Sequence, residues 1–257
     1  MLRARIIPCL LLRQGGLVKT TRFLGPKYVG DPINTVRIFN EKQVDELIVV
    51  DIDASVHGVE PDYSLIANLA SECRMPLCYG GGIKTVEQVD RIISLGVEKI
   101  SLGSAAVETP GLVERAAQRF GSQSIVAVMD VKSCGLWGRY EVCTHNATKR
   151  SGINPVEMAR RMESLGAGEI LLNSVDRDGS GKGYDLPLID SVRRAVRLPM
   201  TILGGAGSLH DMRKLVDHYG VIGAAAGSLF VFKGKYKAVL IQYPNPEEKD
   251  ALCLSSS

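Results

Sequence analysis

The chain has 257 residues, of which 45% are hydrophobic and 23% charged, so it can form one large domain or two small ones. Its formal net charge of +3, without a run of Lys and Arg, argues against nucleic acid as a partner. The apolar stretch near the N-terminus is short and leads straight into charged residues, which favours a buried strand over a signal peptide or membrane span. The six cysteines are scattered without ligand spacing, so we expect a reduced cytoplasmic protein without a metal or other cofactor.

Short β-branched runs alternate with segments of helical period along the chain. Amphipathic stretches such as TVEQVDRIISLG and NPVEMARRMESLG predict helices between these runs. The runs themselves predict strands at residues 5–11, 47–51, 76–79, 99–102, 124–130, 169–173, 200–203 and 221–226. This alternation predicts a closed parallel (β/α)8 barrel, the TIM barrel fold, which we expect to span residues 1–257 as a single domain.

Two segments depart from the alternation. WGRYEVCTH, residues 137–145, predicts an extra hairpin after the fifth strand. Trp137 and Tyr140 in this arm could cover a ligand or pack the arm onto the barrel. From Tyr236 onwards no convincing amphipathic pattern is present, so we expect residues 236–257 to form an irregular tail.

Internal similarity divides the chain into two halves. MPLCYGGGIKTVEQV, from Met75, aligns with LPMTILGGAGSLHDM, from Leu198, and the same spacing separates Glu46 from Glu169. GSAA and GSLF then match at a spacing that is one residue longer. The sequence therefore predicts a barrel built from two similar half-barrels, in which Leu11 of the first strand is the counterpart of Asp130 of the fifth.

Glycine and serine follow the predicted strands at matching places in both halves. GGGIKT and LGSAA in the first half, and GGAGS and AGSLF in the second, can each direct backbone N–H groups at one anion. Two tight turns are the plain alternative. Because barrels regularly bind phosphate at the C-terminal ends of their strands, we favour a ligand with two phosphates.

Several acidic residues fall on the same predicted rim. Asp130 ends a strand, where its carboxylate could act as a general acid or base or cap a helix or loop. Asp51, Asp176 and Asp178 also follow strands. The histidines are isolated and predict surface or loop roles: His57, His145, His210 and His218.

Charged residues also lie at or just before the starts of strands. Arg5 and Leu11 are an even number of residues apart, so they face the same side of the first strand. On composition alone these charges predict a solvated ring of salt bridges at the bottom of the barrel, formed by Arg5, Glu46, Lys99 and Glu169.

From residue 5 to about residue 232 the sequence resembles the HisF-like family, the cyclase subunit of imidazole glycerol phosphate synthase. The matching segments include DIDAS, GGGIKTVE, YEVCTH, LGAGEILLNSVDRDGSGKGYD and GGAGS, in this order along the chain. The resemblance implies a heterodimer with a glutaminase at the N-terminal face of the barrel. It implies that ammonia from the glutaminase passes through the barrel to a bisphosphorylated small molecule, which is cleaved and cyclised.

The resemblance also implies roles for individual residues. The gate where ammonia enters would consist of Arg5, Glu46, Lys99 and Glu169. One phosphate would bind at Gly82, Gly103 and Ser104, and the other at Asp178, Gly179, Gly205, Gly227 and Ser228. Lys19 would lie near the substrate in a mobile loop, and Asp130 matches one of two catalytic aspartates.

The chain departs from the family at the other catalytic aspartate, where it has Leu11, and leucine cannot transfer a proton. Gly103 and Leu203 stand where the family usually has asparagine and serine. With IPCLLL, GPKYVGDPIN and FVFKGKY, these changes resemble an offshoot found with surface-polysaccharide enzymes. There the barrel is thought to supply ammonia to an N-acetyl sugar amidotransferase.

Four functions stay open at this point. The first is an ammonia relay for sugar amidination in lipopolysaccharide or O-antigen biosynthesis. The second is an authentic cyclase of histidine biosynthesis, which makes imidazole glycerol phosphate and an aminoimidazole carboxamide ribotide with Asp130 alone. An aminoaldose-ketose isomerase and a scaffold that binds a phosphorylated ligand without turnover complete the set. The loss of a proton-transfer group at Leu11 favours the relay.

Overall fold

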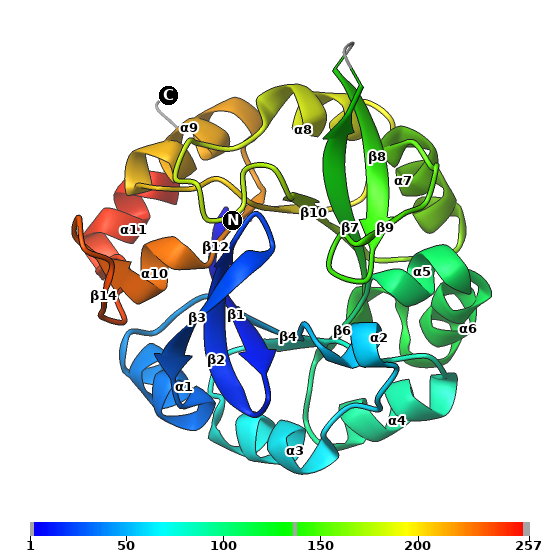
Figure 1. Ribbon diagram of the computed structural model, residues 1–257, viewed down its shortest axis with the longest axis horizontal. Coiled ribbons are helices and arrows are strands. Elements are labelled where there is room, and N and C mark those ends of the chain that lie inside the picture. The colour runs from blue at the N-terminus through cyan, green and yellow to red at the C-terminus, as the bar shows by residue number, and fades with distance from the viewer. Residues whose placement is uncertain (1–2, 136–137, 254–257) are drawn as a thin grey trace.

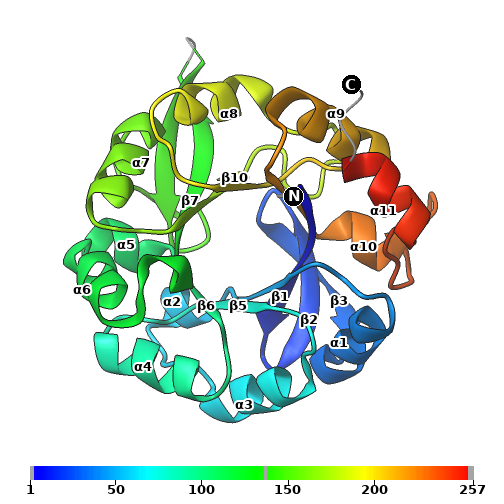
Figure 2. The same cartoon turned by 180° about the vertical axis from the view of Figure 1, so that it is seen from behind.

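The computed structural model describes residues 3–135 and 138–253. Within these residues, eight parallel strands close into a barrel, because β1 pairs with both β4 and β12 and the intervening strands pair in order. The helices lie around the outside, as Figures 1 and 2 show from the two ends. The predicted TIM barrel is confirmed, with strands β1 (Arg5–Arg13), β4 (Leu47–Asp51), β5 (Leu77–Gly80), β6 (Lys99–Leu102), β7 (Ile125–Cys134), β10 (Glu169–Ser174), β11 (Met200–Leu203) and β12 (Gly223–Ala226).

The helices cover the barrel with one apolar face each, as their amphipathic pattern predicts. For example, α4 buries Val89 and Ile92. Asp31, Asp62 and Asn154 cap the N-termini of α1, α3 and α7 with their side chains. The helices are α1 (Pro32–Glu41), α2 (Ala54–His57), α3 (Tyr63–Glu72), α4 (Val86–Ser94), α5 (Ser104–Glu108), α6 (Gly111–Phe120), α7 (Pro155–Ser164), α8 (Leu186–Arg193), α9 (Leu209–Tyr219), α10 (Ser228–Val231) and α11 (Pro246–Cys253), with a 3-10 turn at Ser122–Ser124.

The segment that follows β12 is more regular than the sequence predicts. Strands β13 (Phe232–Lys233) and β14 (Ala238–Val239) form a small hairpin, and α11 packs against α9. Tyr243 Oη donates to the backbone oxygen of Ile6 at 2.8 Å, which fixes this segment to the bottom of the barrel. The expected irregular tail therefore contains a helix and a hairpin.

The two halves of the barrel repeat their local structure. Helix α4 begins with a capping box of Thr85 and Gln88, and α9 begins with a capping box of Ser208 and Asp211. Gly103 and Gly227 precede the short helices α5 and α10 with nearly the same backbone angles, φ −103° and ψ −91° against φ −102° and ψ −75°. These matches support the two half-barrels that the sequence predicts.

The repeat also includes a pair of hairpins, of which the sequence predicts only the second. Strand β7 continues past the barrel and pairs antiparallel with β8 (Arg139–Thr144), which pairs with β9 (Lys149–Arg150). Strand β1 does the same with β2 (Gly16–Thr21), which pairs with β3 (Leu24–Gly30). Both hairpins stand on the same rim in Figure 1.

Tyr140 packs the β7–β8 arm onto the barrel. Its hydroxyl donates to Asp185 Oδ1 at 3.0 Å, and Asp185 caps the N-terminus of α8. Trp137, its predicted partner in the arm, lies outside the described residues. For Tyr140 the structure therefore supports packing rather than the covering of a ligand.

Every second residue of a barrel strand faces the lumen, which connects the two ends of the barrel. Arg5, Ile7, Cys9 and Leu11 thus form one inward column along β1, as their parity predicts. No helix within residues 3–135 and 138–253 has the length and apolarity that a membrane crossing requires. Cys9, Cys73, Cys78, Cys134 and Cys143 form no disulfide with one another.

Candidate functional site

The four charged residues at the bottom of the barrel form a closed ring of ion pairs. Lys99 Nζ lies 2.9 Å from a carboxylate oxygen of Glu46 and 2.9 Å from one of Glu169. Arg5 also contacts both acids, Glu46 through Nη1 and Glu169 through Nη2, the latter at 2.7 Å. Thr201 Oγ1 donates to Glu169 at 2.5 Å. Each acid thus bridges both cations, and the ring of Arg5, Glu46, Lys99 and Glu169 is called the gate from here on.

The two acids of the gate are buried and its two cations are half-buried, so the solvated ring expected from composition is wrong. Glu46 and Glu169 are only 4% and 7% exposed, because inward-facing positions at strand starts lie inside the barrel wall. Burial alone would lower the pKa of Arg5 and Lys99, but the carboxylates of Glu169 and Glu46 more than offset it and raise both. Burial would raise the pKa of Glu169, and the two cations lower it below its usual value.

Above the gate the lumen is mostly apolar. Its buried lining includes Ile7, Cys9, Ile48, Cys78, Val126, Leu171, Leu203 and Ala225. Ser101 Oγ is buried there and has no hydrogen-bond partner among the described residues. A neutral molecule in this lumen would meet hydrocarbon, sulfur and one free hydroxyl.

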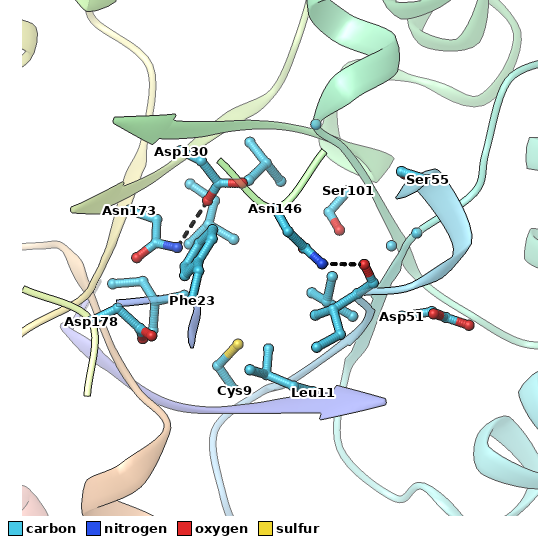
Figure 3. A pocket seen from close by; sticks show the side chains of 18 of the residues that line it. Cys9, Leu11, Phe23, Asp51, Ser55, Ser101, Asp130, Asn146, Asn173 and Asp178 are labelled. Atoms are coloured by element: carbon cyan, nitrogen blue, oxygen red, sulfur yellow. Dashed lines mark hydrogen bonds between the residues drawn. The ribbon is translucent and has the colours of Figure 1, made fainter. Parts of the chain in front are cut away.

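The lumen opens at the C-terminal ends of the strands into a cavity, shown in Figure 3. Both half-barrels and both hairpins contribute to its walls. Polar residues lie toward its rim and apolar residues toward the lumen. The residues that the argument uses are Cys9, Leu11, Lys19, Phe23, Val50, Asp51, Gly103, Ser104, Val128, Asp130, His145, Asn146, Asn173, Asp178, Leu203 and Gly227.

Asp130 has the properties of a proton-transfer group. Burial raises its pKa from 3.8 to about 6, and the negative charge of Asp178 adds to the rise. Asn173 Nδ2 opposes this shift by donating to Asp130 Oδ1 at 2.9 Å. Asp130 does not end its strand as predicted, because β7 continues into the arm, but it lies one residue before the last position where β7 pairs with β10.

The wall across from Asp130 has no such group. Figure 3 shows Leu11 on the far side of the cavity, where it is partly buried. Val50 lies beside it on β4, and Val128 and Leu203 complete the apolar part of the lining. The counterpart of Asp130 in the first half-barrel is therefore a hydrocarbon in a hydrocarbon surrounding.

Two further carboxylates line the cavity. Burial raises the pKa of Asp178, while Lys19 and a hydrogen bond from Thr20 Oγ1 at 3.2 Å oppose the rise. Burial also raises the pKa of Asp51, although Oδ1 accepts from the backbone N–H groups of Asp53 and Ala54 at 3.0 Å each. Asp176 instead accepts from the backbone of Ser133 in the arm, so it supports the arm rather than the cavity.

Lys19 lies on strand β2, not in a loop as the resemblance implied. Its side chain is buried, and its Nζ donates to the backbone oxygen of Cys9. Burial lowers the pKa of Lys19, and the charge of Asp178 opposes this shift. A Cβ at Gly227 would lie 2.4 Å from Nζ, so the end of the lysine would have to shift if this glycine were replaced.

The residues predicted to hold the first phosphate lie together. Gly103 and Ser104 line the cavity, and Gly82 and Ser104 line a neighbouring hollow that Lys84 also enters. Gly82 has φ +73°, and a Cβ there would lie 2.8 Å from the backbone oxygen of Val59. Lys84 brings a positive charge that the sequence prediction did not include.

Only some of the residues predicted to hold the second phosphate line the cavity. Asp178 and Gly227 line the cavity, whereas Gly179, Gly205 and Ser228 do not. Gly179 and Gly205 are packed against backbone instead: a Cβ would lie 2.5 Å from the Thr20 oxygen at Gly179 and 2.2 Å from the Gly183 oxygen at Gly205. Close packing against the backbone therefore explains glycine at these two positions as well as anion binding does.

Sequence reasoning missed the cavity residues that the hairpins supply. Phe23, at the tip between β2 and β3, places its ring in the cavity (Figure 3). His145 lies in a turn, as predicted, but it also lines the cavity, and its backbone N–H donates to Ser104 at 3.1 Å. Asn146 donates to the backbone oxygen of Ile52 at 2.6 Å. These contacts join segments that are distant in sequence, and no local pattern announces them.

No group of three or more His, Cys, Asp or Glu side chains within the described part of the chain could hold a metal ion. The carboxylates of the cavity are separated by amide and apolar side chains, as Figure 3 shows for Asp51, Asp130 and Asp178.

The sequence model of the family described as "Histidine biosynthesis protein" matches residues 5–237. The chain belongs to this family and is HisF-like. It is 56% identical over 97% of its length to "Putative imidazole glycerol phosphate synthase subunit hisF3" of Vibrio vulnificus, covering 96% of that protein. It is 53% identical over 97% of its length to the similarly described hisF2 of Pseudomonas aeruginosa, covering 99%. It is 41% identical over 90% of its length to imidazole glycerol phosphate synthase subunit HisF of Alkaliphilus metalliredigens, covering 91%.

The gate of this HisF-like barrel predicts an effect on stability. Glu169→Gln removes a buried acid and leaves two half-buried cations with one acid, so the free energy of unfolding should fall by on the order of 3 kcal/mol at pH 7. Because the folded-state pKa of Glu169 is lowered from 4.5, this difference is present above about pH 4.5 and disappears as the pH falls through the lowered value. Urea unfolding of both proteins between pH 3 and pH 7 measures it.

The exposed Glu157 on α7 supplies the matched control, since Glu157→Gln should change stability by less than about 0.5 kcal/mol. Equal stability of the Glu169→Gln and Glu157→Gln proteins at pH 7 would contradict a buried gate.

Asp130 predicts the opposite dependence on pH. Its folded-state pKa is raised from 3.8 to about 6, so the free energy of unfolding falls as the pH rises between these two values, and the loss is complete above about pH 6. Asp130→Asn should therefore raise the free energy of unfolding at pH 8, by up to about 2–3 kcal/mol for two pKa units. At pH 5, where most of the native carboxyl is protonated, the gain should be smaller. The same gain at pH 5 and pH 8, or a carbon-13 NMR titration of Asp130 near pH 4, would show that the carboxyl is not perturbed.

Proposed function

We propose that the chain is the ammonia-conducting barrel of a glutamine amidotransferase complex. A glutaminase subunit binds the N-terminal face and releases ammonia at the gate. The lumen carries it to the C-terminal face, where an N-acetyl sugar amidotransferase uses it to amidinate a sugar for lipopolysaccharide or O-antigen biosynthesis. The observation that carries the proposal is the contrast between a complete gate and a cavity with Leu11 across from Asp130.

The lumen suits neutral ammonia better than ammonium or another ion. A charge placed among Ile48, Val126 and Leu171 would lose its hydration without gaining a partner, which is costly. Ammonia needs only a modest hydrogen-bond partner, and Ser101 Oγ offers one inside the lumen. Passage then requires the gate to open, since its ion pairs close the bottom of the barrel.

The cavity has lost half of the acid–base machinery that a cyclase would use. General acid–base catalysis by a positioned side chain is worth on the order of 10²–10⁴ in rate. Leucine at position 11 provides none of it, and Leu203, which pairs with Asn173 in the cavity wall, adds no polar group. A barrel that only delivers ammonia has no need for the second carboxylate.

The loops at the C-terminal ends of the strands support binding of a phosphorylated ligand. Gly103 and Ser104 in the first half, with Lys84 nearby, form an anion site with one positive charge. In the second half, Lys19 faces Gly227, and its charge offsets that of Asp178.

The sequence identities to the relatives are consistent with the proposed offshoot within the family. Relatives described as "Putative" subunits, two of them numbered hisF2 and hisF3, are 53–56% identical to the chain. Two relatives named plainly as HisF are 40–41% identical. A difference in sequence identity of this size is expected if the chain belongs to an offshoot with a changed reaction.

The second candidate is an authentic cyclase subunit of imidazole glycerol phosphate synthase in histidine biosynthesis. It would convert a bisphosphorylated ribulosyl-formimino substrate and ammonia to imidazole glycerol phosphate and an aminoimidazole carboxamide ribotide. The pKa of Asp130, about 6, favours it, because such a group can both donate and accept a proton near neutral pH. Asp51 and Asp178 in the same cavity are the carboxylates that could replace the missing partner.

The gate variant Lys99→Ala tests conduction. In the complex with its glutaminase and acceptor enzyme, transfer of nitrogen from 15N-glutamine should fall about 5-fold to 150-fold, the usual range of coupling between sites. Transfer from added ammonium should stay nearly unchanged, because ammonium reaches the acceptor from solution. Mass spectrometry of the amidinated sugar distinguishes the two nitrogen sources.

Lys214→Ala, at an exposed position of α9, is the control and should leave both sources unchanged. An equal loss with glutamine and with ammonium in Lys99→Ala would count against a channel.

A further inference from the structure

Thr201 is an uncharged residue at the level of the gate. Strand β11 directs its side chain inward, because Leu203, two residues further on, faces the lumen. Thr201 is 1% exposed, and its Oγ1 donates to Glu169 Oε1 at 2.5 Å. A hydrogen bond to a charged acceptor is stronger than one between neutral groups. The hydroxyl of Thr201 is therefore an additional strong contact of one acid of the gate.

The neighbouring strand leaves room for this hydroxyl. Gly223 on β12 pairs with Thr201 on one side and with Arg5 on the other. A Cβ at Gly223 would lie 2.0 Å from Thr201 Oγ1 and 2.8 Å from the Cβ of Thr201. Since β11 and β12 are the strands between Glu169 and Arg5, this side of the ring is filled by Thr201, and a larger residue at position 223 would displace its hydroxyl.

The two carboxylate oxygens of Glu169 have different partners. Oε1 accepts from Thr201 Oγ1 at 2.5 Å and from Arg5 Nη2 at 2.7 Å. Oε2 accepts from Lys99 Nζ at 2.9 Å, which is its one hydrogen bond to another side chain in the described part of the chain. Glu169 is thus held by donors from β11 and β1 on one side and by a single lysine on the other.

Lys99 can leave Glu169 without losing its other partner. Its Nζ contacts both oxygens of Glu46, at 2.9 Å and 3.0 Å, but only one oxygen of Glu169. Lysine also carries its charge on a flexible stem, whereas the planar guanidinium of Arg5 spans both acids and cannot release one without turning against the other. If the Lys99–Glu169 contact breaks, every charge of the gate keeps a partner.

We propose that Thr201 is a positioning residue of the gate. Its hydroxyl keeps Glu169 against Arg5, so the ring opens at the Lys99–Glu169 contact and closes again to the same arrangement. Without the hydroxyl, Glu169 would follow the lysine, and the ring would stay closed. That the opening passes ammonia rests on the proposed function, whereas the hold of Thr201 on Glu169 rests on the contacts alone.

The ionisation of Glu169 reports this hold. Burial raises the pKa of Glu169, and Arg5, Lys99 and the hydroxyl of Thr201 together lower it below its usual value, while Glu46 faces the same two cations. Thr201→Val keeps the shape of the side chain and removes the hydroxyl, so it should raise the pKa of Glu169. Thr201→Ser should bring the pKa back close to that of the unmodified protein. Carbon-13 NMR titration of the glutamate carboxyls in the full chain measures it, with the Glu169 signal identified by its absence in Glu169→Gln.

Thr35→Val is the matched control. Thr35 on α1 is 4% exposed, and its Oγ1 donates to the backbone oxygen of Asp31 at 2.9 Å. This variant also loses one buried hydroxyl, but it should leave the pKa of Glu169 unchanged. The hold of Thr201 is refuted by an unchanged pKa in Thr201→Val, by an equal rise in Thr35→Val, or by a Thr201→Ser protein that behaves like Thr201→Val.

Nitrogen transfer in the complex with the glutaminase and the acceptor enzyme tests the opening. Thr201→Val should lower transfer from 15N-glutamine about tenfold or more, as expected for one hydrogen bond to a charged group, and should leave transfer from added ammonium nearly unchanged. Thr201→Ser and Thr35→Val should keep both. If Lys99→Ala separates the two nitrogen sources but Thr201→Val does not, the role of Thr201 in opening is wrong. If neither variant separates them, the channel and the opening both fall, and the hold of Thr201 on Glu169 stands or falls with the titration.

Discussion

The alternation of side chains along the barrel strands is the constraint on which the rest of this structure depends. It places Arg5, Ile7, Cys9 and Leu11 in one inward column, so a single strand contributes to the gate, the lumen and the cavity. The same period brings Glu169, Leu171 and Asn173 inward from β10. The gate and the cavity are thus two levels of one lumen, so residues at one level can be substituted while those at the other level stay the same.

The surroundings of the gate and of the cavity have opposite effects on the ionisation of their buried carboxyl groups. In the gate every buried charge has two partners of opposite sign, which keeps the cations and Glu169 ionised. In the cavity Asp130 is buried with an amide partner and another acid nearby, which weakens its ionisation. Leu11, on the far side of the same cavity, adds no second buried carboxylate and offers no route for protons.

The sequence predicts the barrel, its strands and its twofold repeat because these follow from local period and spacing. The sequence also allows the gate residues and Asp130 to be named. The burial of the two acids of the gate, however, follows only from closure of the barrel. The turn between β2 and β3 escapes prediction because Arg22 and Phe23, with φ of +53° and +64°, stand where a glycine or asparagine usually signals such a turn. His145 and Asn146 escape because their contacts to Ser104 and Ile52 join the two halves.

The central claim is that the barrel conducts ammonia without performing the cyclase reaction, and a turnover assay tests it most directly. The purified protein and its Leu11→Asp variant are given the bisphosphorylated ribulosyl-formimino substrate with excess ammonium at mildly alkaline pH. The account predicts no turnover by the unmodified, folded protein and detectable turnover by Leu11→Asp, which restores the carboxylate across from Asp130. Turnover by the unmodified protein within about tenfold of 10 s⁻¹, an ordinary enzyme rate, would contradict it and assign the chain to histidine biosynthesis.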